Sequence, residues 1–153
     1  LNIIEWGRKI NEKMPEHVVK LTSDAFTMCN KSIQNSNILI LGVSYKPNVK
    51  DIQLTPAEKI IKKLQNLGAK IYVYDPYFVS NEVFGITTEN DIEKIIPKVD
   101  AAIIVTAHDE FKKLKLSIFS QTSQSILIDT RGIIDPAEAK KEKLIFRGLG
   151  RGD

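Results

Sequence analysis

A tyrosine, a lysine and an asparagine lie close together in a polar loop that follows an apolar run. The run is Ile38–Leu41, and the loop carries Tyr45, Lys46 and Asn48 before a helix starts at Pro56. Loops that join a buried strand to a helix are where α/β folds bind ligands, and a lysine ammonium is a countercharge for a phosphate. The loop therefore predicts a phosphate-binding corner, with Tyr45 as a flat face for a base or sugar. The spacing alone also fits a solvated lysine and a half-buried tyrosine.

This corner differs from a dinucleotide-binding fingerprint. The first glycine after Gly42 is Gly68, so the motif G-x-G-x-x-G is absent. A tight glycine turn would offer mainly backbone amides to a ligand. The long loop found here can instead project side chains at it.

The elements that must position this loop alternate between strands and helices. Four further strand candidates follow the first: Lys70–Tyr74, Ala101–Thr106, Ser125–Asp129 and Lys143–Arg147. The middle ones are nearly continuous apolar runs, as in parallel strands covered on both faces. Helix starts are marked by Thr55-Pro56-Ala57-Glu58, Asp91 and Asp135-Pro136, and helix ends by Gly68 and Pro97. The pattern predicts an α/β fold with a Rossmann-like, doubly wound parallel sheet.

The amino-terminal segment is predicted to be helical. Asn2–Lys13 has apolar residues spaced for one face, Pro15 is expected to break or restart the helix, and Glu16–Lys31 continues the helical spacing. We therefore divide the chain into a connector or dimerisation arm, residues 1–35, and a Rossmann-like domain, residues 36–153.

Other polar residues follow the predicted strands at the same edge of the sheet. Asp75, His108 and Arg131 come after the second, third and fourth strands. Because ligands bind outside the carboxyl ends of such strands, Lys46 and Arg131 together could clamp a diphosphate.

Each of these residues also has a structural interpretation. Arg131 could form an ion pair with Asp129 or Asp135 that fixes a loop. Asp75 fits a turn better than a ribose ligand, since the glycine fingerprint is missing. His108 could be an acid–base group, but no partner lies at a predictable spacing, so a helix-terminal or packing role is favoured.

Composition limits the classes of function. The chain has 153 residues with a net charge of +3, 42% hydrophobic and 27% charged residues, and one cysteine. The charge is too small to indicate a nucleic-acid partner. No apolar run approaches the roughly 20 residues needed to cross a membrane, so we predict no membrane partner. A single cysteine excludes an internal disulfide and favours the cytoplasm.

The motifs together resemble one enzyme family. The segment GVSYKPNVKDIQLTPA, residues 42–57, is followed in order by VYDPY (73–77), IIVTAHDEF (103–111) and IDTRGI (128–133). This series resembles the C-terminal domain of the UDP-glucose/GDP-mannose dehydrogenase family. The branch that it resembles most is that of the UDP-N-acetyl-D-mannosamine (UDP-N-acetylhexosamine) dehydrogenases.

The resemblance implies a function for residues 36–153. In that family the C-terminal domain helps to bind the UDP-sugar, and NAD is bound mainly by an N-terminal domain. The enzymes of the family oxidise the sugar C6 alcohol to a carboxylate through a cysteine thioester, for polysaccharide biosynthesis. They are commonly homodimers that associate through a long helix between their two nucleotide-binding domains. The positions matching Tyr45, Lys46 and Arg131 contact the substrate, so these are our predicted substrate-binding residues.

Three residues differ from the family pattern. Gln53 stands where the family has an arginine that reaches NAD, and Leu54 replaces an acidic residue. We carry over Gln53 alone as a cofactor-binding position. Cys29 lacks the glycine-rich neighbours of the family's nucleophile and is interpreted as a packing residue.

No catalytic residue and no metal site are predicted. We expect the chain alone to bind a UDP-sugar weakly without turnover. The alternative is a truncated, non-catalytic nucleotide-binding or oligomerisation module.

Overall fold

A five-stranded parallel sheet forms the centre of the molecule. The computed structural model describes residues 3–149, with side chains from residue 13 onward. The strands are β1 (Asn37–Leu41), β2 (Lys70–Tyr74), β5 (Ala101–Ile104), β6 (Ile126–Asp129) and β7 (Ile145–Gly148), in the order β2-β1-β5-β6-β7. The predicted α/β, Rossmann-like, doubly wound parallel sheet is confirmed. Each predicted strand lies within two residues of its expected ends.

The strand order has a reversal beside β1. From β1 the chain crosses to β2 on one side, and from β5 it proceeds to β6 and β7 on the other. The loops that follow β1 and β5 therefore leave the sheet in opposite directions. In open sheets of this order, ligands bind at that reversal, outside the carboxyl ends of the strands.

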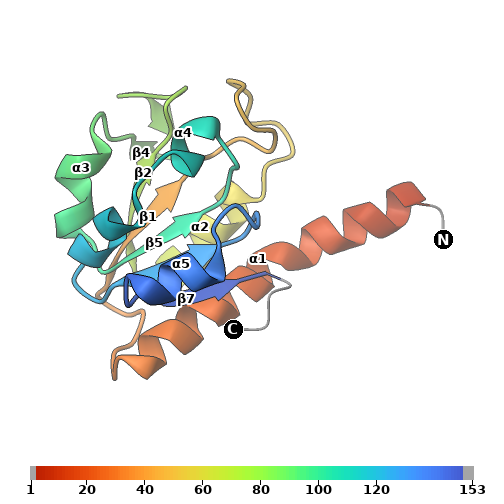
Figure 1. The fold of residues 1–153 in the computed structure, drawn as a ribbon. Helices are drawn as coiled ribbons and strands as arrows, with labels where there is room; N and C mark the ends of the chain where they lie inside the picture. The colour runs from red at the N-terminus through yellow and green to blue at the C-terminus, as the bar shows by residue number, and fades with distance from the viewer. Residues whose placement is uncertain (1–2, 150–153) are drawn as a thin grey trace.

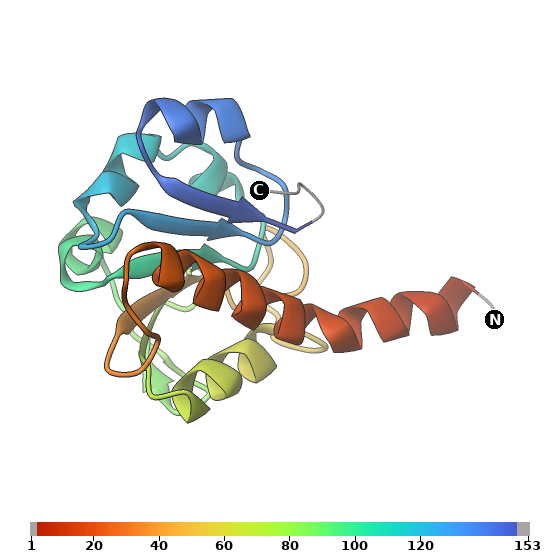
Figure 2. The ribbon, with the colours of Figure 1, turned by 90° about the horizontal axis from the view of Figure 1, so that it is seen from below.

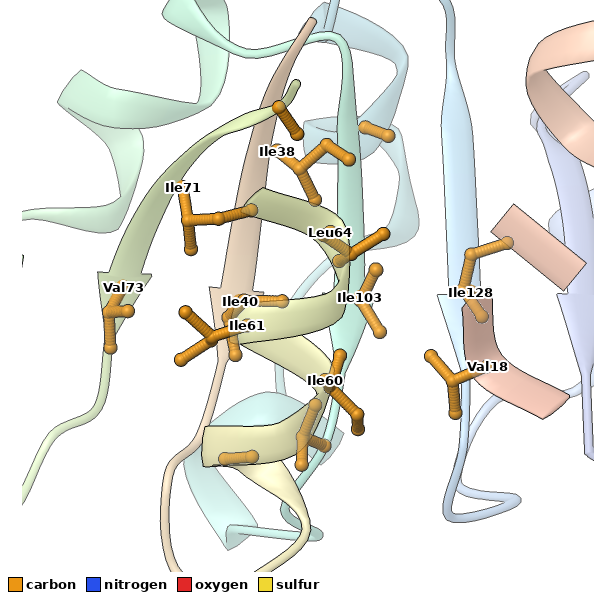
Figure 3. Close-up of a cluster of buried hydrophobic side chains, with 14 of the residues drawn as sticks. Val18, Ile38, Ile40, Ile60, Ile61, Leu64, Ile71, Val73, Ile103 and Ile128 are labelled. Carbon is orange, nitrogen blue, oxygen red and sulfur yellow. The ribbon is translucent and has the colours of Figure 1, made fainter. Parts of the chain in front are cut away.

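The long helix α1 (Ile3–Met28) and α2 (Ala57–Asn66) cover one face of the sheet. Figure 3 shows Ile60, Ile61 and Leu64 of α2 packed against Ile38 and Ile40 of β1. Successive strand side chains point to opposite faces, so the intervening residues of β1 serve the other core. Every residue of β1 after Asn37 is therefore buried.

Short helices cover the opposite face (Figure 1). They are α3 (Ile92–Ile95), η1 (Ile96–Lys98), α4 (Asp109–Lys112), η2 (Leu116–Gln121) and α5 (Pro136–Lys141). The predicted caps hold two of them, since Asp91 accepts the Glu93 amide at 3.0 Å and Asp135 accepts the Ala137 amide at 2.9 Å. Phe111 and Phe119 pack beneath this layer, fully buried.

The predicted break at Pro15 is wrong, because α1 runs through it. Proline removes one hydrogen bond and strains the preceding turn, which costs about 3 kcal/mol in an isolated helix. Met14 and Pro15 are themselves buried at this junction, and Val18 and Phe26 bury the following turns in the core. Packing therefore outweighs the intrinsic preference of proline.

The first half of α1 projects away from the sheet (Figure 2). The predicted apolar face of this half includes Ile3, Trp6 and Ile10, whose side chains lie outside the described part of the chain. No helix within residues 3–149 combines the length and the apolar character needed to cross a bilayer.

A small hairpin after β2 was not predicted. Its strands, β3 (Glu82–Val83) and β4 (Ile86–Thr87), pair antiparallel around Phe84 and Gly85. Both turn residues have positive φ, 52° and 80°. Two-residue hairpins favour this geometry because it matches the twist of the strands.

The core described here can be tested on α2. Replacing the fully buried Leu64 with alanine is expected to lower the free energy of unfolding by about 2–5 kcal/mol, because it leaves a cavity beneath the helix. Urea unfolding followed by circular dichroism measures the change. Leu67→Ala is the matched control, since Leu67 is 46% exposed and its truncation should stay within about 0.5 kcal/mol. Equal losses in the two variants would contradict the assigned packing.

Candidate functional site

The loop after β1 begins with Gly42, a position where any side chain would collide with a neighbouring residue. Gly42 has φ +94°, and a Cβ built on it would lie 2.4 Å from the Cβ of Thr106. The Thr106 hydroxyl donates to the Ser44 carbonyl at 2.6 Å. The start of the loop is therefore fitted directly against the end of β5.

Arg131 joins the loop after β6 to the loop after β1. Its Nη2 donates to the Tyr45 carbonyl at 2.6 Å, and its Cζ lies 5.4 Å from the centroid of the Tyr45 ring. The two residues are 86 positions apart in the sequence and both are half-buried. Two of the predicted substrate-binding residues are thus in direct contact, through a hydrogen bond and a cation–π interaction.

The alternative ion pair of Arg131 is not found. Within the described residues, no carboxylate lies in ion-pairing distance of its guanidinium. Asp129 instead accepts backbone amides, from Arg131 at 2.9 Å, Gly132 at 2.9 Å and Ile134 at 2.8 Å. The Asp129 carboxylate therefore shapes the turn, and the positive charge of Arg131 is left without a neutralising side chain there.

Lys46 combines a fixed backbone with an exposed side chain. Its carbonyl accepts the Ser44 hydroxyl at 2.8 Å. Its side chain is exposed, and its ammonium forms no ion pair within the described part of the chain. The loop thus offers a second positive charge one residue from the carbonyl that Arg131 holds.

A buried polar cluster lies beneath the same loop. His108 is fully buried, its Nε2 lies 3.0 Å from Asp75 Oδ2, and its Nδ1 accepts the Asn48 amide at 2.8 Å. The rings of Tyr77 and Phe111 flank the imidazole, with centroids at 5.1 and 5.5 Å. The ends of β1, β2 and β5 are therefore linked by one side chain.

The structure gives Asp75 and His108 internal partners. Asp75 is fully buried and its Oδ1 accepts the Tyr77 amide at 2.9 Å, the turn interaction that its position in Asp-Pro-Tyr favours. The packing interpretation of His108 agrees with its burial. Both residues were predicted at this edge of the sheet, but their contact with each other was not.

Tyr74, which precedes this cluster, is held as a neutral donor. Its hydroxyl donates to Glu110 Oε2 at 2.6 Å. Burial, and then this hydrogen bond, raise the pKa of Tyr74 above its ordinary value, because both disfavour the phenolate.

Gln53 lies in the outer part of the loop. Its amide donates to Asp51 Oδ1 at 2.8 Å, and its side chain is exposed. The adjacent Leu54 is 92% exposed with φ +57°. Lys50, the neighbouring cation, has its Nζ 5.5 Å from the ring centroid of Phe78.

Cys29 packs far from this loop. Its thiol lies 4.0 Å from the carbonyl oxygen of Gln124, just before β6 and hence at the opposite edge of the sheet. Burial raises the pKa of the Cys29 thiol, which disfavours the nucleophilic thiolate. This agrees with the predicted packing role.

Comparison with known proteins gives the chain its family. Residues 39–136 match the UDP binding domain of the UDP-glucose/GDP-mannose dehydrogenase family. The chain belongs to this family. The matched segment contains Tyr45, Lys46 and Arg131.

Relatives in this family resemble the chain along almost all of its length. It is 35% identical over 152 residues to the UDP-N-acetyl-D-mannosamine dehydrogenase of Pyrococcus horikoshii, covering 99% of this chain and 34% of that protein. It is 30% identical over 154 residues to the UDP-glucose 6-dehydrogenase TuaD of Bacillus subtilis, covering 97% and 32%. The chain thus spans about one third of the length of these curated relatives.

Solved dehydrogenases share the fold. The structure of the UDP-D-ManNAc dehydrogenase from Pyrococcus horikoshii superposes with a TM-score of 0.85 at 33% identity, covering 100% of this chain and 34% of that one. An NDP-N-acetyl-D-galactosaminuronic acid dehydrogenase from Methanosarcina mazei Go1 gives 0.88 at 27% identity, covering 99% and 32%. The family assignment and the fold therefore agree.

The fit of Gly42 against β5 yields a stability test. Gly42→Ala should lower the free energy of unfolding by about 1–2 kcal/mol for the left-handed backbone. The collision with Thr106 should add about 1–3 kcal/mol more. Gly85→Ala isolates the first term, because Gly85 has φ +80° and open space around its Cα. If urea unfolding gives the same loss for both variants, the close approach of Gly42 and Thr106 is wrong.

Proposed function

We propose that this chain is the C-terminal UDP-sugar-binding domain of an NAD-dependent UDP-N-acetylhexosamine 6-dehydrogenase, with UDP-N-acetylmannosamine as its sugar nucleotide. The contact of Arg131 with Tyr45 is the observation that carries the proposal. It joins two predicted substrate-binding residues at the edge of the sheet where the strand order reverses. The names of the relatives supply the class of sugar.

The two cations suit a diphosphate for different reasons. A guanidinium presents five N–H donors in a planar fork, and Arg131 spends one on the Tyr45 carbonyl. The others can bind phosphate oxygens. The Lys46 ammonium is exposed and mobile about its stem, so it acts as a point charge that follows the ligand. Tyr45, which precedes Lys46 in the sequence and contacts Arg131, supplies an aromatic surface for the base or ribose.

Binding, and not the chemical step, is the role that we assign to this chain. Its one cysteine is a packing residue at the opposite edge of the sheet from Lys46. The residue offered to the cofactor is Gln53, which is exposed and uncharged. An amide can donate hydrogen bonds to NAD but brings no countercharge to its pyrophosphate, so other parts of the full-length enzyme would bind most of the cofactor.

The remaining parts of the proposal concern the whole enzyme. We propose a cytoplasmic homodimer that acts in polysaccharide biosynthesis, with residues 1–35 as its connector and dimerisation arm. The projecting first half of α1 supports the arm (Figure 2). The same feature favours the alternative, a non-catalytic oligomerisation module, which would form dimers without binding UDP-sugars.

Calorimetry on the chain tests the nucleotide site. We expect titration with UDP and with UDP-N-acetylmannosamine to give weak, saturable binding. Lys46→Ala and Arg131→Ala should each weaken it about tenfold or more, because a hydrogen bond to a charged group contributes about 1.5–3 kcal/mol.

Lys98→Ala is the matched control for these variants. Lys98 is exposed in η1, which precedes β5 and so lies at the amino edge of the sheet. Its loss should leave the dissociation constant unchanged. A folded chain that gives no heat with either nucleotide would refute UDP binding, and equal affinities for all three variants and the parent chain would refute the clamp.

A further inference from the structure

We propose that His108 is a positioning residue that holds the Lys46 segment in the conformation that binds the diphosphate. This inference rests on the proposed function of the site. It assigns His108 a role in ligand affinity through the loop, with no contact to the ligand.

The hydrogen-bond partners of His108 define its tautomer. The Asn48 amide can only donate, so Nδ1 must carry a lone pair at the 2.8 Å contact. In the neutral ring the proton is then on Nε2, where it donates to Asp75 Oδ2 at 3.0 Å. His108 therefore connects the buried Asp75 carboxylate to the backbone amide of Asn48. We call this series of hydrogen bonds, Asp75–His108–Asn48, the relay.

The carboxylate at the far end of this relay is itself fixed. Asp75 accepts the Val43 amide at 2.9 Å and the Tyr77 amide at 2.9 Å, in addition to His108. Its side chain has no exposed surface. An acceptor held by three donors in the interior is a rigid reference point, because moving it would leave buried donors unpaired.

Asn48 is attached to this relay in two ways. Its backbone amide donates to His108, and its Oδ1 accepts the amide of Asp109 at 3.0 Å. Its φ of +63° lies in the left-handed region, which asparagine tolerates better than most residues. Asn48 is therefore held by both its backbone and its side chain in a conformation that a free loop would rarely adopt.

Lys46 lies between two fixed points of the loop backbone, one at Tyr45 and one at Asn48. On its amino side, Arg131 holds the Tyr45 carbonyl and the Ser44 hydroxyl holds the Lys46 carbonyl itself. On its carboxyl side, His108 holds Asn48. The loop backbone is thus ordered before any ligand arrives, and binding need not supply that order. Releasing the Asn48 end should weaken binding although both cations remain.

Two substitutions separate the halves of the relay. His108→Gln can place its Nε2 near the histidine Nε2, which keeps a donor for Asp75 and leaves the Asn48 amide without its acceptor. His108→Asn can place its Oδ1 near the histidine Nδ1, which keeps that acceptor and abandons Asp75. Both remove the buried ring, so both should lower the melting temperature.

The positioning role predicts that affinity does not follow stability. H108Q should weaken UDP binding about tenfold and speed hydrogen exchange at the Asn48 amide, whereas H108N should keep both within about threefold of the parent chain. Calorimetry with UDP and amide exchange measured by NMR supply the two readouts. Affinities that fall in proportion to the melting temperature in both variants, or a protected Asn48 amide in H108Q, would overturn the inference.

A variant outside the core keeps the test open if H108Q does not fold. Asn48→Gly removes the side-chain acceptor for Asp109 while tolerating positive φ, and it should weaken UDP binding several-fold. Glycine keeps the backbone amide that His108 accepts, so amide exchange at position 48 is measured in the same variant. Faster exchange there with unchanged affinity would overturn the role, because a loosened segment would then bind UDP as well as a fixed one. If the folded parent chain itself does not bind UDP, the proposed function fails and this inference fails with it. If the parent chain binds and the variants match it, the inference alone fails.

Discussion

The carboxyl edge of the sheet depends on a carboxylate that has no access to water. A buried acidic side chain is tolerated only when donors surround it, and Asp75 obtains them from the ends of three strands. Val43 follows β1, Tyr77 follows β2 and His108 follows β5. Satisfying one acceptor therefore requires these three loops to meet. The position of the β1 loop is a consequence of that requirement.

A second buried carboxylate organises the other side of the edge. Asp129 ends β6 and collects three backbone amides of the following turn, which directs the Arg131 side chain back toward β1. The two acidic residues do not pair with either cation of the proposed site. Their carboxylates accept hydrogen bonds from backbone amides instead, so Lys46 and Arg131 remain available to an anionic ligand. A site that neutralised its own cations would have to break those pairs before it could bind phosphate.

Much of this arrangement follows from local sequence, and the exceptions have physical reasons. The apolar runs predicted the strands, and Asp91, Asp135 and Gly68 predicted helix ends, because each acts on neighbouring residues. Pro15 was misinterpreted because burial of the surrounding turns, a tertiary effect, outweighs its local preference. The hairpin was missed because its strands are two residues long and show no periodicity.

Non-local hydrogen bonds were the part of the site that sequence could not supply. Resemblance and strand order placed Tyr45, Lys46 and Arg131 at one edge. The partner of His108 Nδ1, however, is a backbone amide 60 positions away, and a backbone amide leaves no residue-type signature. The same holds for the Tyr45 carbonyl that Arg131 binds. Contacts of this kind decide whether neighbouring residues form a rigid site or only share an edge.

The loop after β1 consequently has two parts, one held in place by hydrogen bonds to other loops and one exposed to solvent. Between Gly42 and Asn48, the backbone groups of five residues hydrogen-bond to residues at the ends of β2, β5 or β6. From Val49 to Leu54 the side chains are exposed, and Leu54 holds a left-handed conformation with 92% of its surface in water. Gln53, the departure from the family's arginine, falls in this second half. Substitution there leaves the fastened half untouched, because no described hydrogen bond of the Asp75 cluster passes through it. The residues proposed for the nucleotide and the position proposed for the cofactor thus lie in different halves of one loop, so under that proposal the change at Gln53 can alter cofactor contact without disturbing nucleotide binding.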